Sequence, residues 1–161
     1  MSGSEKGRIL VVDDDEGICS VVETALKNKG YTVDIAKNAK EAIARTNMNF
    51  YNLSLIDIRL PDMDGTELLT TMKETTPAMI KIILTGYPAL QNAIDAVNRG
   101  AHGYLVKPIN MDDLLRTVER HLKAQRELKE YGQQQVAEFV ETRIKELDAE
   151  QPNTSKTTKN K

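Results

Sequence analysis

Polar side chains that could take part in chemistry follow four short apolar runs of this 161-residue sequence. In chain order they are Asp13 to Asp15, Asp57, Thr85 and Lys107. Carboxylates brought to one place repel one another and raise each other's pKa values, so their convergence implies a bound cation. A hard divalent ion held by a few carboxylates, a carbonyl and water suits Mg²⁺, and the lack of His among these residues argues against zinc.

The same residue types suit phosphoryl transfer. A carboxylate such as Asp57 can act as the nucleophile and form an acyl phosphate when cations stabilise charge on the transferring oxygens. Lys107 supplies a compact positive charge that could pair with Asp57 at rest and with a phosphoryl oxygen afterwards. Thr85 supplies a hydroxyl donor for another oxygen.

Each of these residues also has a simpler interpretation when taken alone. Acidic residues after a strand often cap the next helix, a single Asp is often a turn residue, and a Lys before Pro is usually on the surface. Four such features in this order favour one shared site over four coincidences. Asp15 is the exception, because we interpret it as the N-cap of the first helix.

The elements that must position these residues alternate regularly along the chain. Apolar runs predict strands over 9–12, 32–36, 53–56, 79–84 and 103–106. Between and after them, apolar residues recur at three- and four-residue spacing, which predicts helices, two of them over 66–74 and 90–98. Five strand-helix pairs indicate an α/β fold, an open doubly wound parallel sheet with helices on both faces. Such sheets place their sites beyond the carboxyl ends of the strands.

Helix boundaries and core faces follow from capping residues and periodicity. The first helix is predicted to face the core with a stripe that includes Val21 and to end at Gly30. Asn38 and Glu41 form a capping-box pattern, and the helix that follows is predicted to carry Ala39, Ala42, Ile43 and Met48. The last helix is predicted to start after Asn110.

Composition limits the classes of function. The net charge is −2, which argues against strong sequence-independent binding to nucleic acid. Cys19 is the only cysteine, so it cannot form an intramolecular disulfide, and we predict that it is buried on a helix. The sequence has neither a leader-like start nor an apolar run long enough for a bilayer, and we expect a cytoplasmic location without membrane contact.

Four motifs, ILVVDDD, LIDIRLPDMDG, ILTGY and GYLVKP, resemble in this order those of the response-regulator receiver domain of two-component signal transduction, the CheY-like family. The resemblance covers about residues 7–124 and implies strand order 2-1-3-4-5. It also implies that Asp57 is the phosphoacceptor, that Lys107 and Thr85 assist it, and that the Lys107–Pro108 peptide is cis. The Mg²⁺ ligands it implies are Asp13, Asp14, Asp57 and the backbone carbonyl of Arg59, and the switch residues are Thr85 and Tyr104.

The resemblance implies a signalling switch rather than an enzyme. A sensor histidine kinase or a phosphotransfer protein would supply the phosphoryl group, and a downstream protein would bind the face made by the fourth helix, the fifth strand and the last helix. An aspartate-nucleophile phosphatase would need an acid two residues after Asp57, where Arg59 stands, and a nucleotide-binding domain would need glycines where the three aspartates follow the first strand. A degenerate receiver that acts by binding alone is the remaining alternative.

The ends of the chain are predicted to differ from the receiver. Residues 1–6 are expected to be flexible, 125–150 to extend the last helix, and 151–161 to form a disordered basic tail. The extension carries one apolar stripe, Val136, Phe139, Val140, Ile144 and Leu147, without a sustained heptad. It either docks on a partner or on a twin chain in a homodimer, or it packs on its own receiver or frays. Residues 125–161 show no recognition-helix pattern, so we expect a stand-alone receiver.

Overall fold

Strands and helices alternate five times along the residues that the computed structural model describes, which are 6–86 and 90–150 with the side chains of 90–93 excepted. The strands are β1 (Arg8–Val12), β2 (Thr32–Ala36), β3 (Leu53–Asp57), β4 (Ile80–Thr85) and β5 (Gly103–Val106). The helices are α1 (Glu16–Asn28), α2 (Ala39–Met48), α3 (Gly65–Thr75), α4 (Leu90–Asn98) and α5 (Met111–Glu150). Every predicted element is present, and the predicted fourth strand differs from β4 by one residue at each end.

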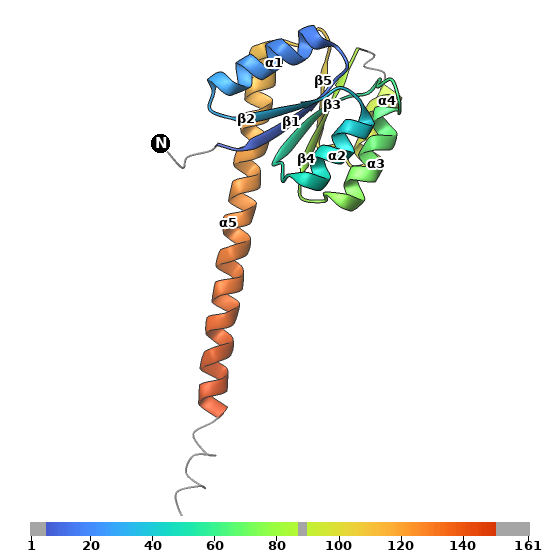
Figure 1. Cartoon of the computed structure of the whole chain (residues 1–161). Helices are drawn as coiled ribbons and strands as arrows, with labels where there is room; N and C mark the ends of the chain where they lie inside the picture. The colour runs from blue at the N-terminus through green and yellow to red at the C-terminus, as the bar shows by residue number, and fades with distance from the viewer. Residues whose placement is uncertain (1–5, 87–89, 151–161) are drawn as a thin grey trace, which may run out of the picture. The chain divides into compact units, whose positions relative to one another are not determined.

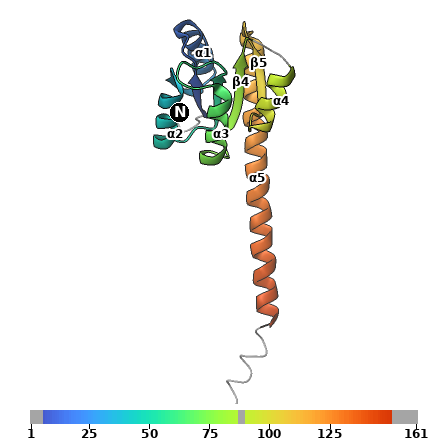
Figure 2. The ribbon, with the colours of Figure 1, turned by 90° about the vertical axis from the view of Figure 1, so that its right-hand side faces the viewer.

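The five strands form one parallel sheet in the order β2-β1-β3-β4-β5. Both the doubly wound α/β fold and the strand order implied by the resemblance are confirmed. In Figure 1 and Figure 2, α2, α3 and α4 lie on one side of the sheet, and α1 and the first turns of α5 lie on the other. The carboxyl ends of all five strands therefore meet at one edge, as parallel pairing requires.

The apolar run in β1 is explained by burial on both faces. Ile9 and Val11 belong to the core cluster under α1 and α5, whereas Leu10 and Val12 belong to the cluster under α2, α3 and α4. All four residues are fully buried. Because side chains alternate between the faces of a strand, a central strand covered on both sides must be apolar at every position.

Val21 in α1 was predicted to face the core, but it is 54% exposed. In α1 the buried positions are Cys19, Val22 and Leu26, and Val21 lies at least 100° away from each of them around the helix axis, outside that stripe. Met48 is the last residue of α2, as predicted, and it is 82% exposed. Met48 follows the buried Ala42 by six residues, which places it about 240° around the helix axis and away from the core.

Side-chain caps begin α2 and α5 where the sequence predicts them. Asn38 accepts a hydrogen bond from the backbone N–H of Glu41 at 2.8 Å. The Glu41 carboxylate in turn accepts from the backbone N–H of Lys37 at 2.7 Å, so the reciprocal bond of the box reaches one residue further back than the pattern requires. Asn110 accepts from the backbone N–H of Asp113 at 3.1 Å. Local sequence thus sets where these helices start.

A lysine is buried in the sheet, where backbone carbonyl groups bind its ammonium group. Lys81 on β4 is 1% exposed, and its Nζ donates to the carbonyl oxygens of Thr76 at 2.7 Å and Met79 at 2.8 Å. Thr76 is the C-cap of α3, where carbonyl groups lack helical partners and attract a cation. Burial lowers the pKa of Lys81 to about 8.

The chain divides into two units, Met1–Leu122 and Lys123–Lys161. Helix α5 starts in the first and continues to Glu150 in the second, which confirms the extended C-terminal helix. None of the helices within the described ranges combines the length and the hydropathy needed to cross a membrane. The predictions for residues 1–5 and 151–161 lie outside the described residues, and the proposed boundaries at 7–124 and 125–150 stay predictions.

Gly65, the first residue of α3, lies against the end of β3. Its N–H donates to the carbonyl oxygen of Ile58 at 2.8 Å. A Cβ at this position would lie 2.5 Å from the carbonyl oxygen of Asp57 and 2.7 Å from the Cα of Ile58. These contacts are with backbone atoms, which cannot move aside as a flexible side chain can. Only glycine lets the loop after β3 return this closely.

We therefore expect Gly65→Ala to destabilise the protein by about 1–3 kcal/mol, the usual cost of overpacking. Urea unfolding measures this free energy. Gly86→Ala is the matched control at the same edge of the sheet, because a Cβ at Gly86 meets nothing within 4 Å. Equal stability of the two variants would contradict the close approach at Gly65.

Candidate functional site

The predicted site residues meet at the carboxyl edge of the sheet. Asp13 follows β1, Asp57 and Thr85 are the last residues of β3 and β4, and Lys107 follows β5. The backbone N–H of Lys107 donates to the carbonyl oxygen of Thr85 at 2.7 Å, so the backbone hydrogen bonds between β4 and β5 continue as far as the site. Strand pairing therefore brings together residues up to 94 positions apart in sequence.

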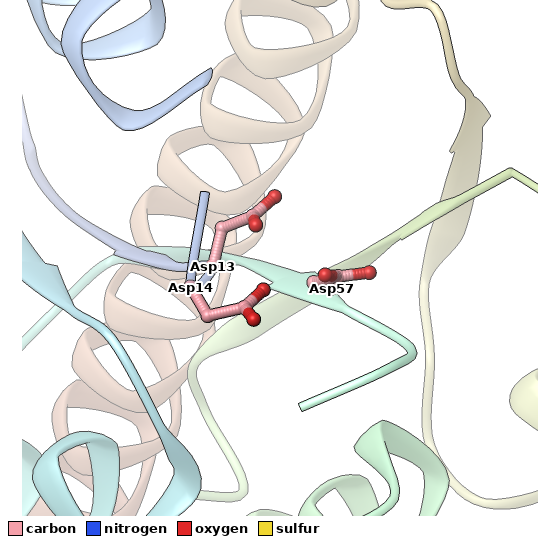
Figure 3. Close-up of side chains that lie close together, drawn as sticks. All are labelled: Asp13, Asp14 and Asp57. Atoms are coloured by element: carbon pink, nitrogen blue, oxygen red, sulfur yellow. The ribbon is translucent and has the colours of Figure 1, made fainter. Parts of the chain in front are cut away.

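Three carboxylates form the centre of the site. One carboxylate oxygen from each of Asp13, Asp14 and Asp57 lies within 4.8 Å of the others. Figure 3 shows these side chains grouped beyond the ends of β1 and β3. Asp13 is fully buried and Asp57 is 6% exposed, whereas Asp14 is exposed to solvent.

Lys107 bridges the two buried carboxylates. Its Nζ lies 2.9 Å from Oδ2 of Asp13 and 3.4 Å from Oδ2 of Asp57. The pairing with Asp57 that the sequence suggests is present, but the shorter contact is with Asp13. Burial would lower the pKa of Lys107, but the hydrogen bonds and charges of Asp13 and Asp57 outweigh burial and raise it. The lysine therefore stays protonated.

Asp57 carries a charge that its surroundings only partly compensate. Burial, foremost, raises the pKa of Asp57, and the charge of Asp13 adds to this effect. The backbone N–H of Arg59, 3.2 Å from Oδ1 of Asp57, and the ammonium of Lys107 act in the opposite direction. Because the net effect is a raised pKa, the ionised carboxylate is destabilised here and a further cation would stabilise it.

Asp15 has a structural role, as predicted. Its Oδ1 accepts hydrogen bonds from the backbone N–H groups of Gly17 at 2.9 Å and Ile18 at 3.2 Å, which makes it the N-cap of α1. Cys19 in the next turn is buried, and its Sγ donates to the carbonyl oxygen of Asp13 at 3.2 Å. Burial is the main factor that raises the pKa of this thiol to about 11, so it does not form a reactive thiolate.

Asp62, in the loop between β3 and α3, has a partner that the sequence did not reveal. Its carboxylate oxygens accept hydrogen bonds from the backbone N–H groups of Ala39 at 2.9 Å and Lys40 at 3.0 Å. These hydrogen bonds are the main cause of the lowered pKa of Asp62. Ala39 and Lys40 open α2, so Asp62 holds the loop after Asp57 against the start of a helix that comes earlier in the chain.

Thr85 and Tyr104 lie on the same face of the sheet. Thr85 is paired in register with Val106, and Ile83 is paired with Tyr104. Residues two apart on a strand share a face, so Thr85 and Tyr104 both lie on the side covered by α4. Thr85 is buried, whereas Tyr104 is 45% exposed.

A polar cavity of about 380 Å³ opens beside Thr85. It is lined by Ile58, Arg59, Asp64, Thr66, Thr85, Asp95 and Arg99. Open space therefore lies beside Thr85.

The Lys107–Pro108 peptide, directly after β5, is cis, which confirms the conformation implied by the resemblance.

The donors of the site fit a hard divalent cation. Three carboxylates, two of them buried, supply oxygen atoms, and the backbone carbonyl of Arg59 follows Asp57 by two residues. Mg²⁺ takes few carboxylates and keeps several waters, which suits an edge that is closed on one side and open at Asp14. The raised pKa of Asp57 also indicates that the site lacks positive charge.

An open parallel sheet that gathers carboxylates, a threonine and a lysine at its carboxyl edge defines a receiver-type domain. The chain belongs to the response regulator receiver domain family, which it matches over residues 9–119. The recognition drawn from the four motifs is thereby confirmed.

Similar proteins include regulators of transcription and isolated receiver domains. The chain is 36% identical over 114 residues to the transcriptional regulatory protein ZraR of Escherichia coli, with 71% of this chain and 26% of ZraR covered. It is 37% identical over 126 residues to the DNA-binding transcriptional regulator NtrC of Proteus hauseri, with 78% and 27% covered. The chain thus spans about a quarter of the length of the curated relatives it matches.

Among solved structures, a CheY-like response regulator receiver domain protein from Methanospirillum hungatei is 44% identical with a TM-score of 0.72, and 74% of this chain and 96% of that chain are covered. NtrX from Brucella abortus is 30% identical with a TM-score of 0.75, and 79% and 29% are covered. The likeness therefore extends over the sheet and its helices.

We expect Mg²⁺ to stabilise the protein, by about 1.4 kcal/mol at a free concentration ten times its Kd. Urea unfolding with and without the metal measures this gain. Asp13→Asn should lose most of it, since a buried ligand is removed. Asp15→Asn is the matched control and should keep it, because Asn caps a helix as well as Asp does. Loss of the gain in both variants, or in neither, would contradict the assignment.

Proposed function

We propose that this chain is a phosphorylated switch in which Asp57 accepts a phosphoryl group from a sensor histidine kinase or a phosphotransfer protein. The observation that carries the proposal is the pairing of Lys107 with both Asp13 and Asp57 at the edge of a receiver sheet. Receiver domains of this family are phosphorylated in Mg²⁺-dependent reactions, and this chain has the matching residue types at each position.

In the proposed transfer, a carboxylate oxygen of Asp57 attacks the phosphorus atom of a phosphohistidine. A new P–O bond forms, the P–N bond breaks, and the leaving imidazole retains the electron pair. Lys107, 3.4 Å from Oδ2 of Asp57 before transfer, is placed to pair with a phosphoryl oxygen after it. The backbone N–H of Arg59 continues to orient the other carboxylate oxygen.

Mg²⁺ held by Asp13, Asp14, Asp57 and the Arg59 carbonyl would neutralise charge on the transferring oxygens. Lys107 then remains free to balance the charge of Asp13 and of the new acyl phosphate. The reaction modifies the chain itself, so we propose a signalling role rather than turnover of an external substrate.

In the proposed switch, a movement of Thr85 causes a movement of Tyr104. The phosphoryl group adds nearly two negative charges and new acceptor oxygens, which draw the Thr85 hydroxyl toward Asp57. Thr85 and Tyr104 share one face of the sheet, so movement of the threonine makes room for the half-exposed tyrosine to turn inward. The surface of α4, β5 and the first turns of α5 would change, and we propose that a downstream protein reads it.

We propose that another protein, rather than a nucleic acid, binds the residues present here and responds to the phosphorylation. The net charge of −2 supports this choice. A cytoplasmic location belongs to the same proposal and is supported by a sequence whose one cysteine is a buried free thiol.

We propose that the phosphodonor protein docks beside the site, in a mainly apolar groove of about 460 Å³ between α1 and the loop after β5. Ile18, Val21, Pro108 and Ile109 are among its lining residues, and Lys107 lies at its border with the site. Val21 is exposed rather than buried in the core, and a contact with a partner in this groove would account for an apolar side chain at that position. A helix seated there would carry its histidine next to Asp57.

Incubation with Mg²⁺ and a small acyl phosphate tests the phosphorylation. The wild type should gain the mass of one phosphoryl group and Asp57→Asn should gain none. Asp15→Asn is the control: Asp15 caps α1, and Asn preserves that cap. A phosphoryl analogue that resists hydrolysis excludes loss during handling. If the wild type neither gains mass nor binds the analogue, the chain is a degenerate receiver that acts by binding alone.

The docking groove is tested by replacing Val21 with Glu. We expect transfer from a cognate phosphorylated kinase to slow by about tenfold or more, because burying an unpaired carboxylate in an apolar contact is costly. Phosphorylation by the small acyl phosphate should be unchanged, since that donor does not use the groove. Met48→Glu, at an exposed apolar residue of α2, is the control. Unchanged transfer from the kinase would reject this docking site and leave the role of Asp57 intact.

A further inference from the structure

The second unit of the chain exposes a row of large apolar side chains. Within α5, Val136, Phe139, Val140, Ile144 and Leu147 are between 42% and 70% exposed. They lie at the three- and four-residue spacing of one helix face. Scattered apolar residues are normal on a surface, but a contiguous row on a helix has a cost in water and is typical of a contact surface.

The seam positions of a coiled coil are occupied by three residues of this row and by the smaller Ala137, whereas Phe139 lies at position c, outside the seam. Ala137, Val140, Ile144 and Leu147 follow one another at steps of three, four and three residues, which corresponds to positions a, d, a and d. Over residues 137–150 the repeat therefore lasts two heptads, about 21 Å of helix. The apolar Val136 flanks the seam at the preceding g position.

The charges beside the seam distinguish between orientations of a second identical helix. Glu141 and Asp148 occupy the e positions, and Arg143 occupies a g position. In a parallel pair, a g residue faces the e′ residue five positions later, so Arg143 of one helix faces Asp148 of the other, twice by symmetry. In an antiparallel pair e faces e′ and g faces g′, so with the four seam residues aligned Glu141 would meet Glu141 and Arg143 would meet Arg143 of the other copy, which are like charges.

We propose that residues 137–150 pair in parallel with the same segment of a second copy of this chain. The inference goes beyond the proposed function, because neither phosphorylation nor docking of a phosphodonor requires it. Two heptads bury less surface than the roughly 1,200 Å² of a stable interface, so the pairing is weak and reversible. Any second contact between the two chains would strengthen it through effective concentration.

Sedimentation equilibrium of the full chain tests the pairing. The weight-average mass of the wild type should rise toward twice the monomer mass as concentration increases. Ile144→Glu should remain monomeric at every concentration, because it places a carboxylate in the seam. Thr142→Glu introduces the same side chain on the opposite side of the helix and should still associate. Circular dichroism should show equal helix content in both variants. A wild type that stays monomeric throughout would overturn the proposal.

Charge reversal tests the parallel register. Arg143→Asp and Asp148→Arg should each weaken association by about threefold to tenfold, since an attractive contact becomes a repulsive one twice in the dimer. The double variant restores opposite charges at the facing positions and should associate as the wild type does. A double variant as weak as the single variants would overturn the parallel pairing.

Disulfide trapping gives an independent measure of orientation. In a parallel pair each d residue faces its own copy, so Val140→Cys should form an intermolecular disulfide under mild oxidation, whereas Thr142→Cys should not. The natural Cys19 contributes little background because it is 3% exposed. Equal trapping of the two variants would count against the seam.

Discussion

The site depends on one electrostatic constraint, which is that two buried carboxylates share a single ammonium group. Asp13 and Asp57 lie at the ends of neighbouring strands, and Lys107 contacts both at 2.9 and 3.4 Å. One positive charge does not balance two negative charges, and burial of Asp57 raises its pKa further. The resting site is therefore short of positive charge. That deficit favours a divalent cation and makes the arrangement of charges sensitive to any group added at Asp57.

The rest of the fold holds this arrangement in place from several directions. Parallel pairing aligns the strand ends, and the close approach of Gly65 returns the chain tightly after Asp57. Asp62 ties the same loop to the start of α2, and Asp15 caps α1 directly after the two aspartates of the site. Each of these contacts involves backbone groups, so the position of Asp57 depends on the backbone path as well as on the side chains of Asp62 and Asp15.

Three surfaces serve three different purposes in the functions proposed here. The groove that contains Val21 borders the proposed phosphorylation site, so it suits the protein that would donate the phosphoryl group. Tyr104 lies on the α4 side of the sheet, on the face proposed for readout. The apolar stripe of residues 137–150 belongs to the second unit and supplies a contact between copies. The three proposed surfaces are made of different residues.

The sequence by itself determined what rests on local spacing. Apolar runs and periodicity predicted all five strands and five helices, capping residues such as Asn38 and Asn110 predicted where helices start, and the order of strands implied a site at their carboxyl ends. Only the tertiary structure decided which partner each side chain meets. It placed Lys107 closer to Asp13 than to Asp57, joined Asp62 to α2, exposed Val21 and Met48, and buried Lys81 against two carbonyl groups. The reason is physical: periodicity is a property of one element, whereas contact distances and burial depend on how separate elements pack.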